Sequence, residues 1–215
     1  MLNGNMLIAH GGGPTPVINS SLLGAVREAK RHPEIETIYG ARFGAEGILA
    51  GDLMDLGRFS DDELGLLSRT PASALGSCRR KLTDADYPAV LECFKKFNIR
   101  YFFYNGGNDS MDTCHKVYQL ACQSGYELRV IGIPKTIDND LAVTDHCPGF
   151  GSAAKYAAVS ALELAFDASA LPIHVVVMEL MGRNAGWITA ASALFADRMP
   201  CEHLVYLPET DFDKQ

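Results

Sequence analysis

The sequence has no long hydrophobic run, no tract of consecutive lysine and arginine longer than three residues, and no signal peptide. The absence of a long hydrophobic run excludes a conventional membrane-spanning segment and gives no reason to expect export. The formal net charge is −7, so the chain as a whole has little electrostatic attraction for nucleic acid or for an anionic membrane. We therefore expect neither nucleic acid nor a membrane as a partner, and any anion site must be local.

The six cysteines are not arranged as a metal module or as a disulfide framework. They are scattered along the chain, and none belongs to a C-x-x-C pair: Cys78, Cys93, Cys114, Cys122, Cys147 and Cys201. Zinc modules and small secreted scaffolds need closely spaced cysteines. We therefore expect reduced thiols in a cytoplasmic protein.

The composition is that of a globular protein that can bury a core. Of the 215 residues, 47% are hydrophobic and 21% are charged. A chain of this length fits one ordinary domain, or one large domain followed by part of a second. Intrinsic disorder is a poor account of this balance.

Short hydrophobic runs alternate with longer amphipathic stretches. The short runs predict strands at 6–10, 35–41, 101–104, 128–133, 174–180 and 204–207. The longer stretches predict helices at 17–31, 84–98, 110–124 and 151–168. This alternation predicts an α/β fold with three layers, in which helices cover both faces of a mostly parallel sheet. The last predicted strand lies close to the final residue, Gln215, so we expect the second domain to be incomplete.

Two predicted strands end in glycine-rich turns that each lead into a helix. Gly11, Gly12 and Gly13 follow the first strand, and the segment 105–110 (NGGNDS) follows a later one. Glycines let the backbone approach an anion closely, and a helix N-terminus adds unpaired N–H groups. The first turn is neither G-x-G-x-x-G nor a Walker A loop. Each turn also has a plain structural interpretation, as a tight turn or as a helix cap.

Charged residues gather in three further segments. The segment 134–140 (PKTIDND) places a lysine and two aspartates directly after a buried strand, and 181–183 (MGR) places an arginine after another. A lysine there supplies a cation for a phosphoryl oxygen, and a carboxylate can accept a hydroxyl proton. The segment 75–81 (LGSCRRK) contains three adjacent cations. Charge alone does not separate a local anion site from a surface cluster.

These segments, taken in order, resemble those of the phosphofructokinase family over essentially the whole chain. The matching segments are Gly11-Gly12 followed by Asn19, then 75–79, 106–110, 134–140, Gly149-Phe150 and 181–183. The resemblance implies that the chain, residues 1–215, is the N-terminal catalytic region: the phosphoryl-donor domain and the start of the sugar-phosphate domain. It implies a glycolytic kinase that phosphorylates fructose 6-phosphate with the help of Mg²⁺ and forms a homo-oligomer when full length.

The resemblance also implies roles for individual residues. Asp138 resembles the general base that takes the proton of the 1-hydroxyl of fructose 6-phosphate. Thr136 and Asp140 would hold the sugar hydroxyls and the reacting geometry. Further contacts are implied for fructose 6-phosphate (Met181, Gly182 and Arg183) and for the phosphoryl donor (Gly12, Arg79, Gly107 and Ser110). Asn108 stands where many relatives have an aspartate that binds Mg²⁺, and a neutral amide is a weaker ligand for a hard cation.

The choice of phosphoryl donor depends on Asp109 and Lys135. ATP-dependent relatives typically have glycine at both positions, whereas members that use diphosphate resemble this sequence at both. A carboxylate at position 109 would repel the α-phosphate of a nucleotide, and a lysine at position 135 can neutralise diphosphate. We therefore predict diphosphate as donor, and expect Asp109, Lys135 and Asp138 to face one shared cleft.

Three alternatives remain open at this stage. An ATP-dependent 6-phosphofructokinase is disfavoured by Asp109 and Lys135. A nicotinamide-dependent dehydrogenase should have an acidic residue near Tyr39-Gly40, at the end of its second strand, and the sequence has none there. The third alternative is an inactive fragment that binds sugar phosphate, which the length of the chain favours.

Overall fold

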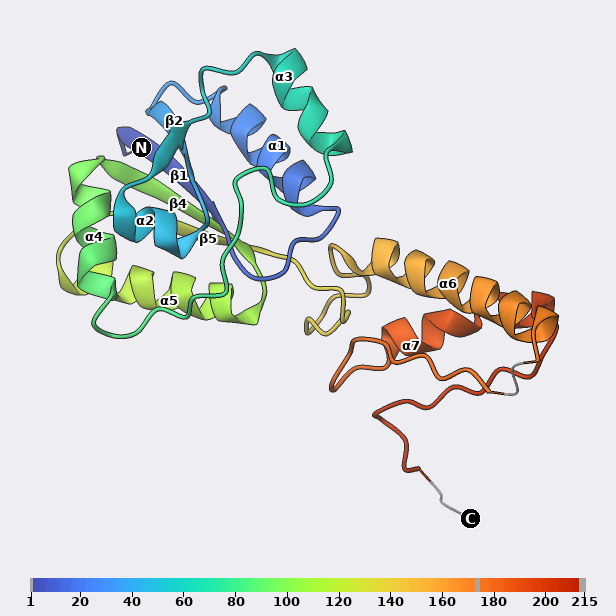
Figure 1. Ribbon diagram of the computed structural model, residues 1–215. Helices are drawn as coiled ribbons and strands as arrows, with labels where there is room; N and C mark the ends of the chain where they lie inside the picture. The colour runs from blue at the N-terminus through green and yellow to red at the C-terminus, as the bar shows by residue number, and fades with distance from the viewer. Residues whose placement is uncertain (1, 173–174, 213–215) are drawn as a thin grey trace. The chain divides into compact units, whose positions relative to one another are not determined.

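The computed structural model describes residues 2–172 and 175–212. The chain divides into two compact units, Met1–Lys135 (unit 1) and Thr136–Gln215 (unit 2), and each is described by itself. Figure 1 follows the chain from the strands of unit 1 into the long helix of unit 2.

Unit 1 is built on a five-stranded sheet in the order β3-β2-β1-β4-β5. The strands are β1 (Gly4–His10), β2 (Ile35–Ala41), β3 (Leu53–Asp55), β4 (Ile99–Gly106) and β5 (Arg129–Pro134). β1 pairs in parallel with both β2 and β4, and β4 pairs in parallel with β5. Only β3 runs antiparallel, beside β2 at one edge. The mostly parallel sheet is therefore confirmed, and the short antiparallel strand is an addition to the prediction.

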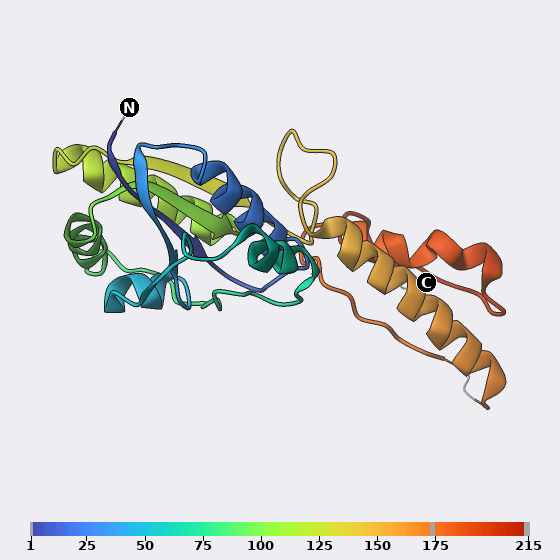
Figure 2. The ribbon, with the colours of Figure 1, turned by 90° about the horizontal axis from the view of Figure 1, so that it is seen from above.

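Helices cover both faces of this sheet. One face packs against α2 (Ala45–Ala50), α4 (Tyr87–Lys96) and α5 (Asn108–Gln123), and its core includes Phe94 and Phe102. The other face packs against α1 (Ile18–Ala29) and α3 (Asp61–Gly65), which is followed by the short helix η1 (Leu66–Arg69). Figure 2 gives a second view of the same layers. Side chains alternate between the faces of a strand, so Leu7 and Ala9 face α4 and α5, whereas Met6 and Ile8 face α1.

Unit 2 is helical in its described part. α6 (Phe150–Ala170) runs for 21 residues, and α7 (Trp187–Ala191) and η2 (Ser192–Arg198) pack along it. The buried side chains of α6 are all alanines: Ala154, Ala157, Ala158, Ala161 and Ala165. Small side chains on that face leave room for the two shorter helices to pack against α6. Figures 1 and 2 both show α7 lying beside α6.

Two predicted strands do not form. Within 174–180, residues 175–180 have no regular secondary structure, and His174 lies outside the described residues. The segment 204–207 likewise has no regular secondary structure. Val177 is 89% exposed and Leu204 is 62% exposed. A strand requires a neighbour that supplies backbone hydrogen bonds, and in the described part of unit 2 no strand lies beside either segment.

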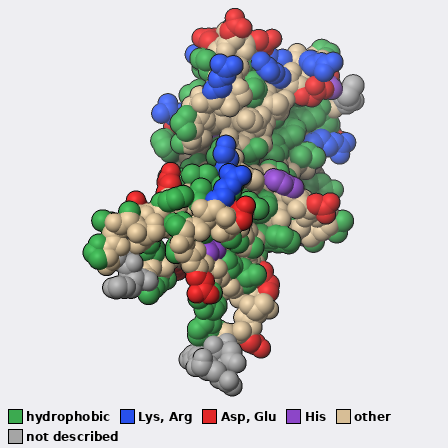
Figure 3. Space-filling view, turned by 90° about the vertical axis from the view of Figure 1, so that its right-hand side faces the viewer, with side chains coloured by type: hydrophobic (Ala, Val, Ile, Leu, Met, Phe, Trp, Pro, Cys, Tyr) green, Lys and Arg blue, Asp and Glu red, His purple; other side chains and the backbone are tan. Residues whose placement is uncertain are grey.

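The surface of the molecule carries both kinds of charge. On the face drawn in Figure 3, acidic and basic side chains are interspersed and hydrophobic side chains lie between them. None of the helices in the described part of the chain is long and apolar enough to span a bilayer.

Candidate phosphoryl-transfer site

The polar turns of unit 1 meet because their strands are neighbours in the sheet. His10 at the end of β1 is in register with Asn105 of β4, and Gly106 is in register with Pro134 at the end of β5. The Gly11 N–H donates to the Asn105 carbonyl (2.9 Å), and the Lys135 N–H donates to the Gly106 carbonyl (3.0 Å). The carboxyl ends of parallel strands are where ligands bind in open α/β sheets. The two glycine-rich turns and Lys135 therefore share one edge of the sheet, as the sequence predicted.

The first glycine turn is closely covered by its surroundings. Gly12 adopts a φ of +75°, which an L side chain rarely adopts. A Cβ on Gly11 would collide with the Ser110 hydroxyl oxygen. Ser110 itself is buried and turned toward Gly11 and Gly106. A larger residue at Gly11 would therefore displace the start of α5.

A segment distant in the sequence completes this turn. Residues 70–79, called the strap below, pass beside it, and the backbones of Gly11 and Cys78 pair in parallel. The Gly12 N–H donates to the Cys78 carbonyl (3.0 Å), and the Ser77 hydroxyl donates to the Gly12 carbonyl (2.6 Å). An open groove of about 360 Å³ lies here, lined by Gly12, Gly13 and the strap. The sequence identified Arg79 as a candidate, but the pairing with the strap was not predicted.

Two cations face the glycine turn without a carboxylate partner. The Lys135 Nζ lies 3.6 Å from the position that a Cβ on Gly12 would take, and the Arg79 Nη2 lies 3.4 Å from that position on Gly13. Neither side chain forms an ion pair within the part of the chain that the structure describes. Burial, followed by the positive charge of Arg79, lowers the pKa of the Lys135 ammonium. Lys135 is 6% exposed as a residue. A buried cation with no counter-charge is costly, and a bound anion would offset that cost.

The start of α5 places Gly107, Asn108 and Asp109 at the same edge. Gly107 is the N-cap, and no side chain caps the first turn, so Asp109 and Ser110 do not act as caps. The Asp109 carboxylate forms an exposed ion pair with Lys81 at 3.2 Å. Among the described residues, Asp109 and Lys135 form no ion pair with each other. The Asp109 side chain therefore points toward Lys81, which follows the strap.

The carboxylates of unit 2 form a compact turn directly after Lys135. The Asp138 N–H donates to the Thr136 hydroxyl (3.1 Å), which itself donates to the Asp140 carboxylate (3.0 Å). One carboxylate oxygen of Asp138, Oδ1, is buried without a hydrogen-bond partner in the described structure. Burial and then the negative charge of Asp140 raise the pKa of the Asp138 carboxyl. A carboxylate that is both poorly solvated and more basic than usual is suited to accept a proton.

Asn139 shapes this turn and was not among the predicted site residues. It adopts a φ of +57°, a left-handed conformation that asparagine tolerates better than most residues. Its side-chain oxygen accepts the Cys147 N–H (2.7 Å), and its amide donates to the Asp145 carbonyl (3.2 Å). The asparagine type and its position between two aspartates were the available signals. Asn139 therefore fixes the backbone that carries Asp138 and Asp140.

The third segment of predicted site residues lies in a loop of unit 2 before α7. Met181 and Arg183 are exposed, and Gly182 has a φ of +128°. A Cβ on Gly182 would collide with the Ala185 carbonyl oxygen. The Gly186 N–H, at the end of the loop, donates to Glu209 at 2.7 Å. The loop thus presents an arginine side chain on a backbone that requires glycine.

The chain offers an incomplete set of metal ligands. Within residues 2–172 and 175–212, no group of three or more His, Cys, Asp or Glu side chains is placed to hold a metal ion. Asn108 and Asp109 have exposed side chains with oxygen atoms at the start of α5. Mg²⁺ commonly takes only one or two protein ligands and completes its shell with water and phosphate oxygens. These two residues therefore fit a metal ion that is carried mainly by a phosphate substrate.

The family model described as Phosphofructokinase matches residues 5–215. The chain therefore belongs to the phosphofructokinase family. Among its relatives, a pyrophosphate–fructose 6-phosphate 1-phosphotransferase from Halomonas elongata is 46% identical, over 100% of this chain and 54% of that protein. The crystal structure of a pyrophosphate-dependent phosphofructokinase from Nitrosospira multiformis matches with a TM-score of 0.86 and 45% identity, covering 98% of this chain and 54% of that one.

An ATP-dependent relative is more distant. The ATP-dependent 6-phosphofructokinase from Amycolatopsis methanolica is 32% identical, over 94% of this chain and 42% of that protein. The chain spans about half the length of the curated relatives it matches.

Proposed function

We propose that this chain forms the donor-binding and proton-accepting part of a diphosphate-dependent phosphofructokinase. The reaction transfers a phosphoryl group from diphosphate to the 1-hydroxyl of fructose 6-phosphate, and it yields fructose 1,6-bisphosphate and phosphate. The observation that carries this proposal is the pair of cations, Lys135 and Arg79, that face a glycine turn with no carboxylate partner among the described residues. The names of the relatives at 46% identity and of the structure at 45% identity support the same donor and acceptor.

Each residue in the proposed reaction has a task that its surroundings suit. Asp138 accepts the proton of the 1-hydroxyl, and the resulting alkoxide oxygen attacks the phosphorus of diphosphate. The bond between that phosphorus and the bridging oxygen breaks, and phosphate leaves. Lys135 and Arg79 neutralise the negative charge that accumulates on the leaving phosphate, as phosphoryl transfer requires. The first glycine turn supplies close backbone contact with the donor through Gly12, and Gly107, the N-cap of α5 after the neighbouring strand β4, supplies a second.

The sugar phosphate is assigned to unit 2. Thr136 and Asp140 hold the sugar hydroxyls, and the 181–183 loop contacts the sugar phosphate through Met181, Gly182 and Arg183. An arginine suits this task because its planar guanidinium can donate two hydrogen bonds to one phosphate. The exposure of Arg183 in this chain leaves its donors available.

The choice of diphosphate over ATP rests on Asp109 and Lys135. The Asp109 carboxylate lies exposed at the start of α5, at the sheet edge where the glycine turn binds the donor. In a nucleotide donor, the α-phosphate is a further negative group, and the Asp109 carboxylate would repel it. Diphosphate has no such group. Magnesium ion bound to the diphosphate, with Asn108 as a protein ligand, would neutralise further charge.

The decisive experiment measures both donors on the full-length protein that carries this chain. We expect turnover with diphosphate, fructose 6-phosphate and Mg²⁺, and negligible turnover with ATP. Replacing both determinants, Asp109→Gly with Lys135→Gly, should lower turnover with diphosphate and admit ATP. Robust ATP turnover by the unaltered protein, without diphosphate turnover, would overturn the proposed donor.

Three wider properties follow from the family and belong to the proposal: the full-length protein is a homo-oligomer, it is cytoplasmic, and it serves glycolysis. A second candidate function, an inactive fragment that binds sugar phosphate, is favoured by the exposed apolar segments 175–180 and 204–207. Activity of the isolated 215-residue chain separates these two functions, because only the enzyme proposal allows turnover.

A further inference from the structure

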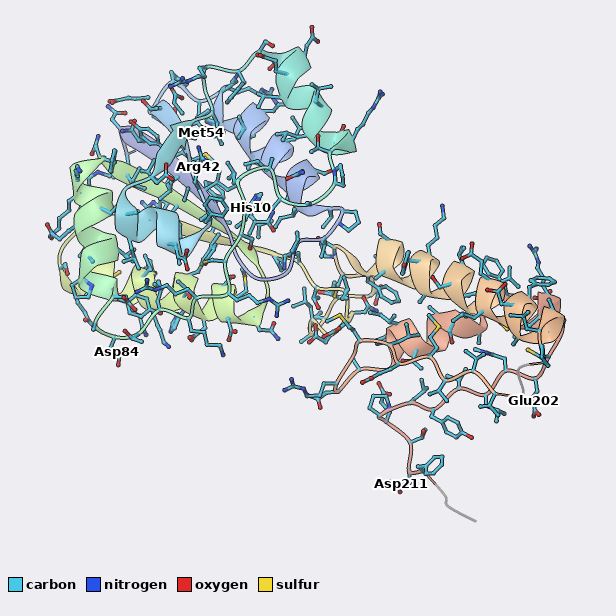
Figure 4. The ribbon with its side chains drawn as sticks, in the orientation of Figure 1. His10, Arg42, Met54, Asp84, Glu202 and Asp211 are labelled. Carbon is cyan, nitrogen blue, oxygen red and sulfur yellow. The ribbon has the colours of Figure 1, made fainter. Side chains whose placement is uncertain are left out.

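His10 is a fully buried titratable residue to which the proposed reaction gives no task. It is the last residue of β1 and directly precedes the glycine turn. Alternation along β1 puts its side chain on the same face as Met6 and Ile8, toward α1. Figure 4 labels His10 inside unit 1. A buried imidazole directly before the glycine turn needs a physical explanation, because burying an apolar residue there would cost less free energy.

The hydrogen bonds of Ser73 determine which nitrogen of His10 carries the proton. The Ser73 hydroxyl donates its single proton to the Gly76 carbonyl (2.7 Å). The His10 Nδ1 lies 2.6 Å from the same hydroxyl oxygen. Since Ser73 has no second proton to give, Nδ1 must be the donor in that contact. The neutral ring therefore carries its proton on Nδ1, and Nε2 is an acceptor.

The other side of the ring is dry. The Nε2 of His10 is buried and has no hydrogen-bond partner in the described structure. Burial, followed by the positive charge of Lys135, lowers the pKa of His10 to about 4. The ring therefore stays neutral near pH 7, so it adds no third positive charge beside Lys135 and Arg79, the two cations proposed to serve the anion site.

The bond from His10 reaches the part of the strap that leads to Arg79. Ser73 and Gly76 close a tight turn, in which the Gly76 N–H also donates to the Ser73 carbonyl (3.0 Å). Asn19 of α1 holds both the beginning of the strap and the turn: its amide donates to the Thr70 carbonyl (2.8 Å), and its oxygen accepts the Ala74 N–H within the turn (2.8 Å). His10 thus contributes the side-chain contact from β1 to the turn itself.

We infer that His10 is a positioning residue for the donor site: its Nδ1–H holds Ser73 and the 73–76 turn, and so sets Arg79 beside Gly13. The inference rests on the proposed function, since it assigns Arg79 to diphosphate. It assigns His10 no contact with substrate. Loss of the bond should therefore weaken diphosphate binding and leave the sugar phosphate and the proton acceptor unaffected.

Two substitutions of the same residue distinguish this role from simple packing. In His10→Asn the amide nitrogen sits where Nδ1 was and can still donate to Ser73. In His10→Gln the amide lies one atom further out, near the place of Nε2, and that bond is lost. Both variants are polar, neutral and smaller than or close to histidine in size. Ser73→Ala removes the same bond from the other side, together with the bond from Ser73 to the Gly76 carbonyl, at a half-buried position outside the core.

The kinetic test uses the full-length protein and measures KM for diphosphate, KM for fructose 6-phosphate, and kcat. One buried hydrogen bond corresponds to roughly tenfold in affinity. We expect about a tenfold rise of KM for diphosphate in His10→Gln and Ser73→Ala, with the other two constants within about threefold of wild type. His10→Asn should keep the wild-type KM. Equal losses in the asparagine and glutamine variants, or equal rises of both KM values, would overturn the inference.

A second readout is independent of activity. Long-range ¹H–¹⁵N NMR of the full-length protein should show a protonated Nδ1 and an unprotonated Nε2 for His10. The opposite tautomer overturns the inference even where diphosphate is turned over normally. Absence of diphosphate turnover in the wild type, with the expected tautomer, overturns the proposed function instead, and with it the assignment to Arg79. If the His10 variants do not fold, Ser73→Ala alone decides the kinetic part.

Discussion

The two units differ in how completely they bury their hydrophobic side chains. In unit 1, large side chains such as Phe94 and Phe102 are fully buried on a sheet that is covered on both faces. In unit 2, the buried face of α6 consists of alanines, while large hydrophobic side chains are exposed: Tyr156, Val159, Phe166, Val175, Val177, Leu204 and Tyr206. The proposed anion site thus lies in the unit whose sheet has a buried core on both faces. The carboxylate turn and the arginine loop belong to a unit whose apolar surfaces lack partners in the described chain.

The two units also differ in the substrate to which their residues are assigned. The groups assigned to the donor, Arg79 and Lys135, belong to unit 1, and those assigned to the sugar phosphate, from Thr136 to Arg183, belong to unit 2. Changes in unit 1 should therefore act on diphosphate, and changes in unit 2 on turnover and on fructose 6-phosphate. Each prediction below uses the full-length protein unless stated otherwise.

The largest expected effect is on turnover, from Asp138→Asn. The amide cannot accept the hydroxyl proton, and general base catalysis contributes about 10² to 10⁴ in rate. We expect kcat to fall by roughly that factor while both KM values change much less. Asp145→Asn makes the same chemical change at an exposed position of the same unit and should leave kcat unaltered. A kcat loss of less than about tenfold in Asp138→Asn would remove this residue from the proposed mechanism.

The difference in burial can be tested with two phenylalanines in the 215-residue chain. Phe94→Ala empties a fully buried site against Phe102 and should lower the free energy of unfolding by about 3–5 kcal/mol. Phe166, on α6, is 52% exposed, and Phe166→Ala should cost less than about 0.5 kcal/mol. Hydrogen exchange of the β1 and β4 amides, and of the α6 amides, measures the two effects separately. Equal losses would mean that unit 2 buries its hydrophobic residues as well as unit 1 does.

Lys135→Met tests the donor side of the comparison. It removes a buried cation that faces the glycine turn but keeps a side chain of similar length. The loss of one group that stabilises transition-state charge costs about 10² to 10³ in rate, so we expect a fall of about 10² in kcat/KM for diphosphate. Lys155→Met, at an exposed position on α6, serves as the control. If instead only the KM for fructose 6-phosphate rose by a comparable factor, Lys135 would act on the sugar phosphate and not on the donor.

Much of unit 1 could be predicted from the sequence because its signals are local. The hydrophobic run 35–41 became β2 without adjustment, and the amphipathic run 110–124 became α5 to within two residues. The order of the strands also brought the turns after β1, β4 and β5 to one edge, since these three are neighbours. Parallel strands place their carboxyl ends together, so the strand ends alone predicted where the proposed anion site lies.

The features that were missed or wrong depend on distant parts of the chain. The pairing of Gly11 with Cys78, and the ion pair of Asp109 with Lys81, join residues that no sequence pattern connects. The predicted strands at 174–180 and 204–207 have strand-like composition, but the described chain gives them no neighbour. Strand propensity describes how a residue fits a sheet that is already there.

The smallest expected effect is a shift in the pH dependence of turnover. Burial is the main cause of the raised pKa of Asp138, and the charge of Asp140 adds to it. Because the base must be unprotonated, activity is lost as the pH falls through that raised pKa. Asp140→Asn removes the repelling charge, so the acid limb of kcat/KM for fructose 6-phosphate should move to lower pH, but not fully to that of an exposed aspartate. Asp145→Asn should leave the limb in place. An acid limb that moves upward, or does not move, in Asp140→Asn would show that a group other than Asp138 accepts the proton.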